Sequence, residues 1–250
     1  MSIVERLRSQ RVARSKPLKA LALATSLFVS FAVGASSESL QSYQPVAPTI
    51  DQARANILIA RQLQFTHFRD LRVSDELSGD IFDTYLNYLD GQKVYLTQND
   101  LDGIVDVRDH LGSALRIGKL QPGFDIYNLV QKRIIERLHF ALNLLDQGVG
   151  SLDFSGNDSI LLDRSDSDWI ANNARLDELW TKRIKNAVLA QRLNGSDDDA
   201  ITDTLRQRYQ AQLKRAYQAR SEDAFQAYMN AFAGMLSPCS TAPLKTSTLI

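Results

Sequence analysis

The sequence predicts an all-α fold, an irregular multi-helix domain of about six or seven helices that follows a signal peptide and a linker. Three observations support this prediction. Hydrophobic residues make up 44% and charged residues 23% of the 250 residues, the composition of a globular protein with a core. Apolar residues recur at spacings of three and four along most of the chain, as on one face of an α-helix. No run of alternating Val, Ile and Thr residues indicates a β-strand.

The N-terminus has the three parts of a secretory signal peptide. Residues 1–35 contain six Lys or Arg residues and one acidic residue, and include the apolar run ALALATSLFVSFAV and the small residues Gly34 and Ala35. We therefore expect cleavage after Ala35 and export to the periplasm. The apolar run is shorter than the roughly 20 residues of a membrane-spanning helix. Inner-membrane association is therefore expected only if this segment stays uncleaved.

A linker and two helices are predicted next. Residues 36–49 contain Pro45, Pro48 and several Ser residues without a period, which predicts a flexible linker. A helical domain is expected over residues 50–236, and its first helix runs from Asp51 to about Arg69. The second helix is GDIFDTYLNYLDG, with Gly91 as the expected stop. Its predicted apolar face consists of Ile81, Phe82, Tyr85, Leu86 and Leu89, and its predicted polar face of Asp80, Asp83, Asn87 and Asp90.

The middle of the chain contains the most regular pattern. Thr97 and Asp100 resemble a capping box at the start of a helix that runs to about Gly118. An amphipathic helix is then predicted over residues 124–148, FDIYNLVQKRIIERLHFALNLLDQG. Its predicted buried face consists of Tyr127, Val130, Ile134, Leu138, Ala141 and Leu145. The segment SLDFSGNDSILLDRSDSDW is predicted to be a loop, because Gly, Asn and several Asp residues break the period.

Three further helices are predicted over residues 175–193, 197–219 and 222–236. Gly195 is the expected stop of the first, and Ser196 and Ser221 are the expected caps of the other two. The predicted buried residues are Leu176, Leu179, Trp180, Ile184 and Ala187, then Ile201, Leu205, Tyr209, Leu213 and Ala216, then Phe225, Tyr228, Met229, Phe232, Met235 and Leu236. Residues 237–250 are rich in Ser and Thr and are expected to be disordered.

No group of residues in the sequence points to a catalytic, cofactor or metal site. His67, His110 and His139 fall on separate predicted helices and lack the spacing of metal ligands. Cys239, the only cysteine, has no arranged His or Lys beside it to activate its thiol and cannot form an internal disulfide. The sequence also lacks phosphate-binding Gly-rich loops and the Gly-x-Ser-x-Gly and Ser-x-x-Lys motifs.

The charge distribution argues against nucleic acid and calcium as partners. Beyond residue 35 the chain has 23 basic and 28 acidic residues, without the clustered Lys and Arg side chains that bind phosphates. Lys214 and Arg215, near Tyr209 and Tyr217, are offset by the acidic residues of 197–203. The acidic clusters lack the spacing of a calcium-binding loop. They are therefore expected to be solvated helix ends; their members are Asp100, Asp102, Asp106 and Asp109, and Asp197, Asp198 and Asp199.

Five segments resemble the N-terminal helical domain of the bacterial tail-specific proteases, a family also called carboxy-terminal processing peptidases. In family order they are QFTHFRDLRVSDELSGDIFDTYLNYLDGQKVYLTQNDL, YNLVQKRIIERLHFALNLLD, DFSGNDSILLDRSDSDW, LDELW and SEDAFQAYMNAFA. They cover most of residues 50–236. The third segment is the most specific, because it is not helical and helix periodicity would not produce it.

The resemblance implies an exported serine endopeptidase that cleaves proteins with apolar C-termini. In the family a PDZ domain and then a Ser/Lys dyad follow the helical domain. No residue here matches the dyad, so no catalytic residue is carried over. The family continues its last helix with an acidic residue and Pro-His-Thr, whereas Pro238 stands here without that acid and histidine. The sequence therefore predicts a fragment truncated by a frameshift or premature stop and without proteolytic activity of its own.

Two functions remain open from the sequence. The first is the helical scaffold domain of a periplasmic tail-specific protease, whose partners are substrate proteins or an adaptor. The alternative is a stand-alone periplasmic helical module that binds a protein partner. An independent hydrolase has no motif in its support. Neither of the first two functions requires a cofactor.

Overall fold

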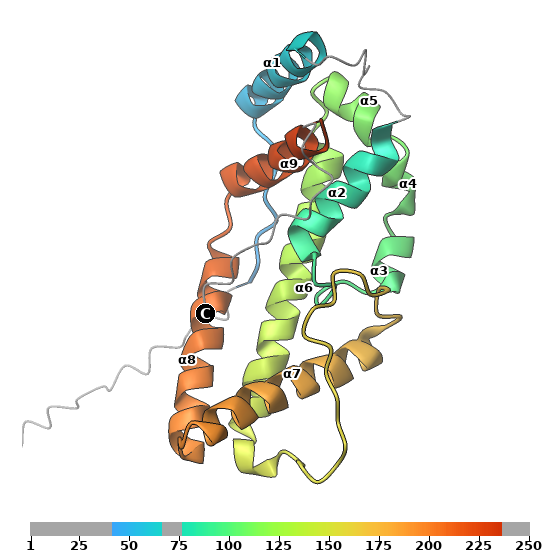
Figure 1. The fold of residues 1–250 in the computed structure, drawn as a ribbon. Helices are drawn as coiled ribbons and strands as arrows, with labels where there is room; N and C mark the ends of the chain where they lie inside the picture. Colours follow the sequence, from blue (N-terminus) through green and yellow to red (C-terminus); the bar gives the residue numbers. More distant parts are fainter. Residues whose placement is uncertain (1–41, 67–76, 237–250) are drawn as a thin grey trace, which may run out of the picture. The chain divides into compact units, whose positions relative to one another are not determined.

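The computed structural model describes residues 42–66 and 77–236, which lie in the compact unit Leu40–Ile250. Within these residues the chain forms nine α-helices and no β-sheet, which confirms the predicted all-α class (Figure 1). The predicted signal peptide and C-terminal tail, with Cys239, lie outside the described residues. The helices are α1 (Ile50–Thr66), α2 (Ser78–Asp90), α3 (Gln98–Asp102), α4 (Val105–Arg108), α5 (Leu111–Arg116), α6 (Gln121–Asp146), α7 (Asn173–Leu193), α8 (Asp198–Tyr217) and α9 (Ser221–Leu236), with a short 3-10 helix at Val149–Ser151.

The longest helix, α6, connects two hydrophobic clusters. Its 26 residues span roughly 39 Å at about 1.5 Å per residue. Figure 1 shows α2 and α9 beside one half of α6, and α7 and α8 beside the other half. The first cluster includes Tyr85, Phe124, Tyr228 and Phe232, and the second includes Leu138, Leu145, Trp180, Ile184 and Leu205. The helix faces predicted from the sequence supply most of these residues because each apolar stripe packs against another helix.

The prediction of one helix from Thr97 to about Gly118 is wrong, because the structure divides these residues into three helices, α3, α4 and α5. The predicted capping box is confirmed: Asp100 N donates to Thr97 Oγ1 at 3.3 Å, and Thr97 N donates to the Asp100 carboxylate at 2.9 Å. Each junction is closed by an i to i−3 bond, from Ile104 N to Leu101 O and from His110 N to Val107 O. The residues at these junctions include Gly, β-branched and Asp residues, which have low helix propensity, so the helix is interrupted there.

The predicted caps of the last two helices need correction. The N-cap of α8 is Asp197 and not Ser196, because the Asp197 carboxylate accepts the Ala200 amide hydrogen at 2.8 Å. Ser221 is the first residue of α9 and not its cap. Its hydroxyl donates to Ala47 O at 2.9 Å, while the Arg220 amide is bound by the Asp223 carboxylate at 2.9 Å. A carboxylate therefore satisfies a backbone donor at each helix start, as the positive end of a helix favours.

The last part of the predicted flexible linker is held in place by specific hydrogen bonds. The Asn128 side chain on α6 binds both backbone groups of Val46, with distances of 2.9 Å to its nitrogen and 2.9 Å to its oxygen. The Tyr43 hydroxyl donates to the same Asn128 oxygen at 2.7 Å. Thr49 then caps α1, because its Oγ1 accepts the Gln52 amide hydrogen at 3.2 Å. Residues 42–49 are thus part of the packed domain. Proline and serine content did not reveal this, because the binding partner lies far away in the sequence.

In the described part of the chain, no helix is both long enough and apolar enough to cross a bilayer.

Candidate functional site

The residues considered from the sequence as sites do not come together. His110 is exposed at the start of α5, and His139 lies on α6, where its Nε2 is 3.0 Å from the Tyr217 hydroxyl. His67 and Cys239 lie outside the described residues. Tyr209 points into the second hydrophobic cluster against Trp180, so it forms no aromatic face with Lys214 and Arg215.

The acidic residues serve helix ends and ion pairs. Asp100 belongs to the capping box and also binds Arg133, whose Nε lies 2.9 Å from Asp100 Oδ1. Asp198 receives both Nε and Nη2 of Arg192, at 2.9 and 2.8 Å. Among the residues that the structure describes, no group of three or more His, Cys, Asp or Glu side chains could hold a metal ion.

One buried carboxylate organises the turn between α2 and α3. Asp90 is predicted on the polar face of α2, but this is wrong, because only 3% of its surface is exposed. Its oxygens accept the amide hydrogens of Val94, Tyr95 and Leu96, each at 2.9 Å. Burial raises the pKa of Asp90, although these backbone hydrogen bonds and the charge of Arg183 oppose that increase. The three bonds explain why an acidic residue ends this helix inside the core.

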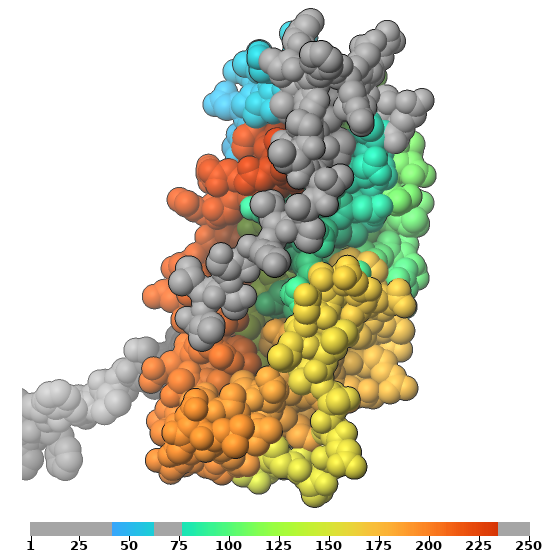
Figure 2. Space-filling model, in the orientation of Figure 1, coloured from blue at the N-terminus to red at the C-terminus, as the bar shows by residue number. Residues whose placement is uncertain are grey.

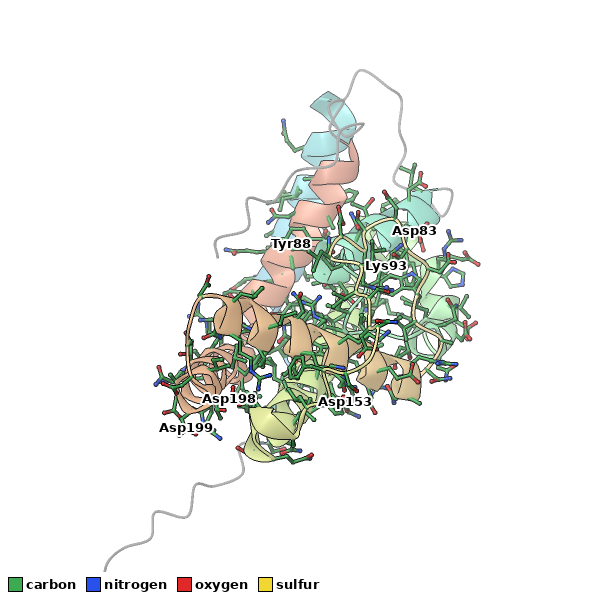
Figure 3. All side chains as sticks on the ribbon, turned by 60° about the horizontal axis from the view of Figure 1, so that its bottom comes forward. Asp83, Tyr88, Lys93, Asp153, Asp198 and Asp199 are labelled. Carbon is green, nitrogen blue, oxygen red and sulfur yellow. The ribbon has the colours of Figure 1, made fainter. Side chains whose placement is uncertain are left out.

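Gly91 follows α2 as predicted, but its φ of −60° is right-handed. The residue with a left-handed backbone in this turn is Lys93, at φ +52°. This conformation directs Lys93 to the loop that joins α6 to α7, where its Nζ donates to Ser167 O and lies 5.6 Å from the centre of the Trp169 ring (Figure 3). A strained backbone at one residue therefore positions a cation against the loop.

The loop of residues 152–172 is fixed to the turn at several points. Gln98 N donates to Ile170 O at 2.7 Å, next to an isolated parallel bridge between Thr97 and Ile170. Gln92 binds the loop from the other side, because its amide donates to Asp163 and accepts from the Arg164 backbone at 2.9 Å. Most of these bonds join residues more than 70 positions apart. The loop thus has a defined conformation without being a helix or a strand.

The start of the loop rests on α7. Asp153 accepts both the amide and the hydroxyl of Ser155, at 2.8 and 2.7 Å, which forms a local turn (Figure 3). The Phe154 ring lies 4.6 Å from the guanidinium of Arg192, and Asp158 forms an ion pair with Lys185. These contacts use long side chains of α7 to hold the loop.

Between this loop and α7 lies an open pocket of about 470 Å³. Figure 2 shows the loop on the surface, in yellow, next to α7 in orange. We call this the loop–α7 pocket. It combines apolar and charged walls, and the residues used below are Ile160, Leu161, Arg164, Trp169, Arg175 and Lys182. Mixed apolar and polar walls are typical of pockets that bind ligands or peptide segments.

The family of the chain follows from comparison with known proteins. The model of the family described as tail specific protease N-terminal domain matches residues 59–241. The chain belongs to the tail-specific protease family. It is 33% identical over 181 residues to the tail-specific protease of Haemophilus influenzae. These residues are 71% of this chain and 25% of that protein, so the chain spans about a quarter of its relative.

Membership in the tail-specific protease family confirms the resemblance seen in the sequence. The matched residues include α2 to α9 and the whole loop–α7 pocket. The sequence identified the loop as the most specific segment, but the pocket was missed. The sequence feature that could have indicated the pocket was the pair Leu161 and Leu162, two apolar residues inside a polar loop. The pocket itself depends on how the loop packs on α7.

Proposed function

We propose that this chain is the helical scaffold domain of an exported tail-specific serine endopeptidase that degrades proteins with apolar C-termini. The observation that carries the proposal is the family match over residues 59–241. The two hydrophobic clusters support it, because they pack the helices along α6 into one platform. The scaffold holds substrate proteins or an adaptor near catalytic groups that other parts of such a protease supply.

The hydrogen bonds of the domain support a non-catalytic role. A serine nucleophile needs a base, such as Lys or His, within hydrogen-bond reach of its hydroxyl. In the described ranges, no hydrogen bond joins a serine hydroxyl to a Lys or His side chain; for example, Ser78 binds Gly112 N, Ser165 binds Asp163 and Ser221 binds Ala47 O. We therefore propose that the chain by itself cleaves no substrate.

A cleavage assay tests this proposal. The full 250-residue chain is incubated with a reporter protein that ends in an apolar tag, with the Haemophilus influenzae protease as positive control. We expect no cleavage by the chain. Turnover that a serine-directed reagent abolishes would contradict the non-catalytic role.

A chimera tests the scaffold role directly. Residues 59–241 replace the matched region of the Haemophilus influenzae protease, and cleavage of the tagged reporter is measured. The scaffold proposal predicts that the chimera still cleaves the reporter, because the exchanged helical domain should pack against the rest of the protease as the original domain does. A chimera that folds, as judged by circular dichroism, but cleaves nothing would argue for the stand-alone module.

We also propose that residues 1–35 direct export to the periplasm and are removed there. The basic start, the apolar run and the small residues before Ser36 support this proposal. Expression in a Gram-negative host, followed by osmotic release and mass spectrometry, tests it. A periplasmic chain that begins near Ser36 is expected, whereas a cytoplasmic or membrane-bound chain that retains Met1 would contradict it.

The alternative function is a stand-alone periplasmic module that binds a protein partner. The exposed apolar residues beside the loop–α7 pocket favour it, because an apolar patch on a surface commonly marks a protein contact. The chimera separates the two functions, since only the scaffold function requires exchange into a protease.

A further inference from the structure

We propose that the loop–α7 pocket binds an extended segment of another protein that carries an acidic side chain next to an apolar one. This inference does not rest on the proposed function, because it concerns a site complete within this chain. Three observations support it: exposed apolar side chains, unpaired backbone groups and a cation without a carboxylate partner. All three occur within the segment Ser159–Arg164 and its surroundings.

The apolar part of the site consists of Ile160, Leu161 and Trp169, which line the pocket, and of the exposed Leu162 next to Leu161 in the chain. Leu161 is 58% exposed and Leu162 is 70% exposed, although both follow the half-buried Ile160. Trp169 adds an aromatic wall, and Lys93 Nζ lies 5.6 Å from the centre of its ring. An apolar side chain of a partner that enters the pocket would remove these surfaces from water, which favours binding.

The backbone part of the site is the segment Ser159–Leu162. Within residues 42–66 and 77–236, the backbone groups of this segment form no hydrogen bond with other backbone groups. Unpaired N–H and C=O groups at a surface can pair with an extended peptide, as in the addition of a strand to a sheet edge. An extended partner segment therefore satisfies these groups while its alternate side chains face the pocket.

The charged part of the site is Arg164. Its Nη2 donates to the backbone oxygen of Asp168 at 3.3 Å, and its Nε is buried without an acceptor. It forms no ion pair with any carboxylate of the described residues.

The other two cations of the pocket are already paired. Arg175 binds Glu178 at 2.9 Å, and Lys182 lies 4.0 Å from Asp158. Asp168 and Glu178 also line the pocket, but neither forms an ion pair with Arg164, which is therefore the pocket cation left to bind an incoming carboxylate. An acidic side chain suits its planar guanidinium, which can donate two parallel hydrogen bonds.

The site is formed before a partner arrives. Gln92 holds the Arg164 backbone, Gln98 holds Ile170, and Lys93 holds Ser167. These contacts fix the loop on the turn that Asp90 organises. Binding therefore orders only the incoming segment, which lowers the entropic cost of association.

A peptide titration tests the proposal. The probe is the unlabelled peptide Gly-Ser-Val-Glu-Leu-Thr-Ser-Gly, acetylated and amidated so that its only carboxylate is the Glu side chain. We expect saturable binding to the full 250-residue chain below about 1 mM by isothermal titration calorimetry. In ¹⁵N-labelled protein the indole signal of Trp169 should shift, and that of the buried Trp180 should not. Absence of binding at this concentration would overturn the proposal.

Matched peptides and variants locate the binding. Replacing Glu by Gln in the probe, or Arg164→Gln in the protein, should each weaken binding about fivefold, as expected for loss of an ion pair. Leu161→Ser should also weaken binding, whereas Leu193→Ser should not, because Leu193 is exposed on α7 away from the pocket lining. Circular dichroism checks that each variant is folded.

The outcomes are distinct. Equal binding of the Glu and Gln peptides would overturn the acidic specificity, and equal effects of the Leu161 and Leu193 variants would overturn the location. If sodium sulfate shifted the indole signal of Trp169 but no peptide bound, the pocket would be a simple anion site, and this result would also overturn the proposal.

Discussion

The indole Nε1 of Trp180 donates a 2.7 Å hydrogen bond to the carbonyl oxygen of Val94, and this bond attaches α7 to the turn after α2. Both residues are buried in the second hydrophobic cluster, and the Trp180 ring also contacts Tyr95 and Tyr209. The turn that supports the loop–α7 pocket is therefore held by two elements, the Asp90 carboxylate at the end of α2 and Trp180 on α7.

Trp180→Phe should destabilise the domain by about 1–3 kcal/mol, because the buried Val94 oxygen loses its donor. Urea unfolding measures the change in free energy. Trp169→Phe is the control, since its indole nitrogen donates no hydrogen bond within the described part of the chain. A Trp180→Phe variant as stable as the Trp169→Phe variant would show that the bond contributes little.

Two glycines in helices should respond in opposite directions to alanine. A Cβ at Gly123 would lie 2.2 Å from Cε1 of Tyr228, whose ring is fully buried against Tyr85. Gly123→Ala should therefore cost roughly 1–3 kcal/mol through overpacking. A Cβ at Gly234 meets no atom within 4 Å. Gly234→Ala should raise stability by roughly 0.5–1 kcal/mol, because alanine favours the helix.

Thermal and urea unfolding of both variants check this pair. If both alanine variants gained stability, the close contact between α6 and α9 at Gly123 would be in doubt. If both lost stability, the open surface at Gly234 would be in doubt.

Asp100 should make the domain sensitive to acid. Burial raises the pKa of its carboxyl, but hydrogen bonds from Arg133 and Thr97 outweigh burial, and the net pKa lies below the ordinary value of 3.8. A carboxyl with a lowered pKa in the folded state stabilises the fold above its unfolded pKa. This contribution is lost as the pH falls through the folded value.

The free energy of unfolding should therefore fall from about pH 4 downward, and Asp100→Asn should reduce that slope. The control is Asp102→Asn, because Asp102 is exposed on the same short helix. Urea titrations between neutral pH and acid measure both slopes. Equal slopes for the two variants would show that Asp100 is not a source of acid sensitivity.

Asn128 should hold residues 43–47 on α6. In Asn128→Ala both backbone bonds to Val46 and the bond from Tyr43 are lost. The Val46 amide should then exchange with solvent about tenfold faster or more, because local opening becomes easier. Hydrogen exchange measures the rate, with Asn143→Ala as the control at an exposed position of the same helix. Unchanged exchange at Val46 would mean that other contacts hold the segment.

The buried faces of the long helices follow from the sequence alone. Leu138 and Leu145 on α6, and Ile184 on α7, have the spacing of one helix face, and all three are buried. This spacing is a local property, so it predicts burial without knowledge of the partner helix. The Thr97 and Asp100 capping box is predictable for the same reason, because both residues belong to one turn.

Long-range contacts account for what the sequence did not reveal. Asp90 appears polar in its helix, yet it is buried because three amide groups of the following turn need an acceptor. Residues 42–49 appear to be a linker, yet Asn128, 82 positions from Val46, binds their backbone. No pattern within a short window contains either partner.

By itself, therefore, the sequence determined the all-α class, the apolar faces of the long helices and, through its resemblance, the tail-specific protease family. Only the tertiary structure decided the division of α3 to α5, the docking of residues 42–49 and the loop–α7 pocket. The physical reason is the range of the interactions. A helix face depends on residues three and four apart, whereas the loop depends on partners such as Lys93 and Ser167, 74 positions apart, that meet only when the chain has folded.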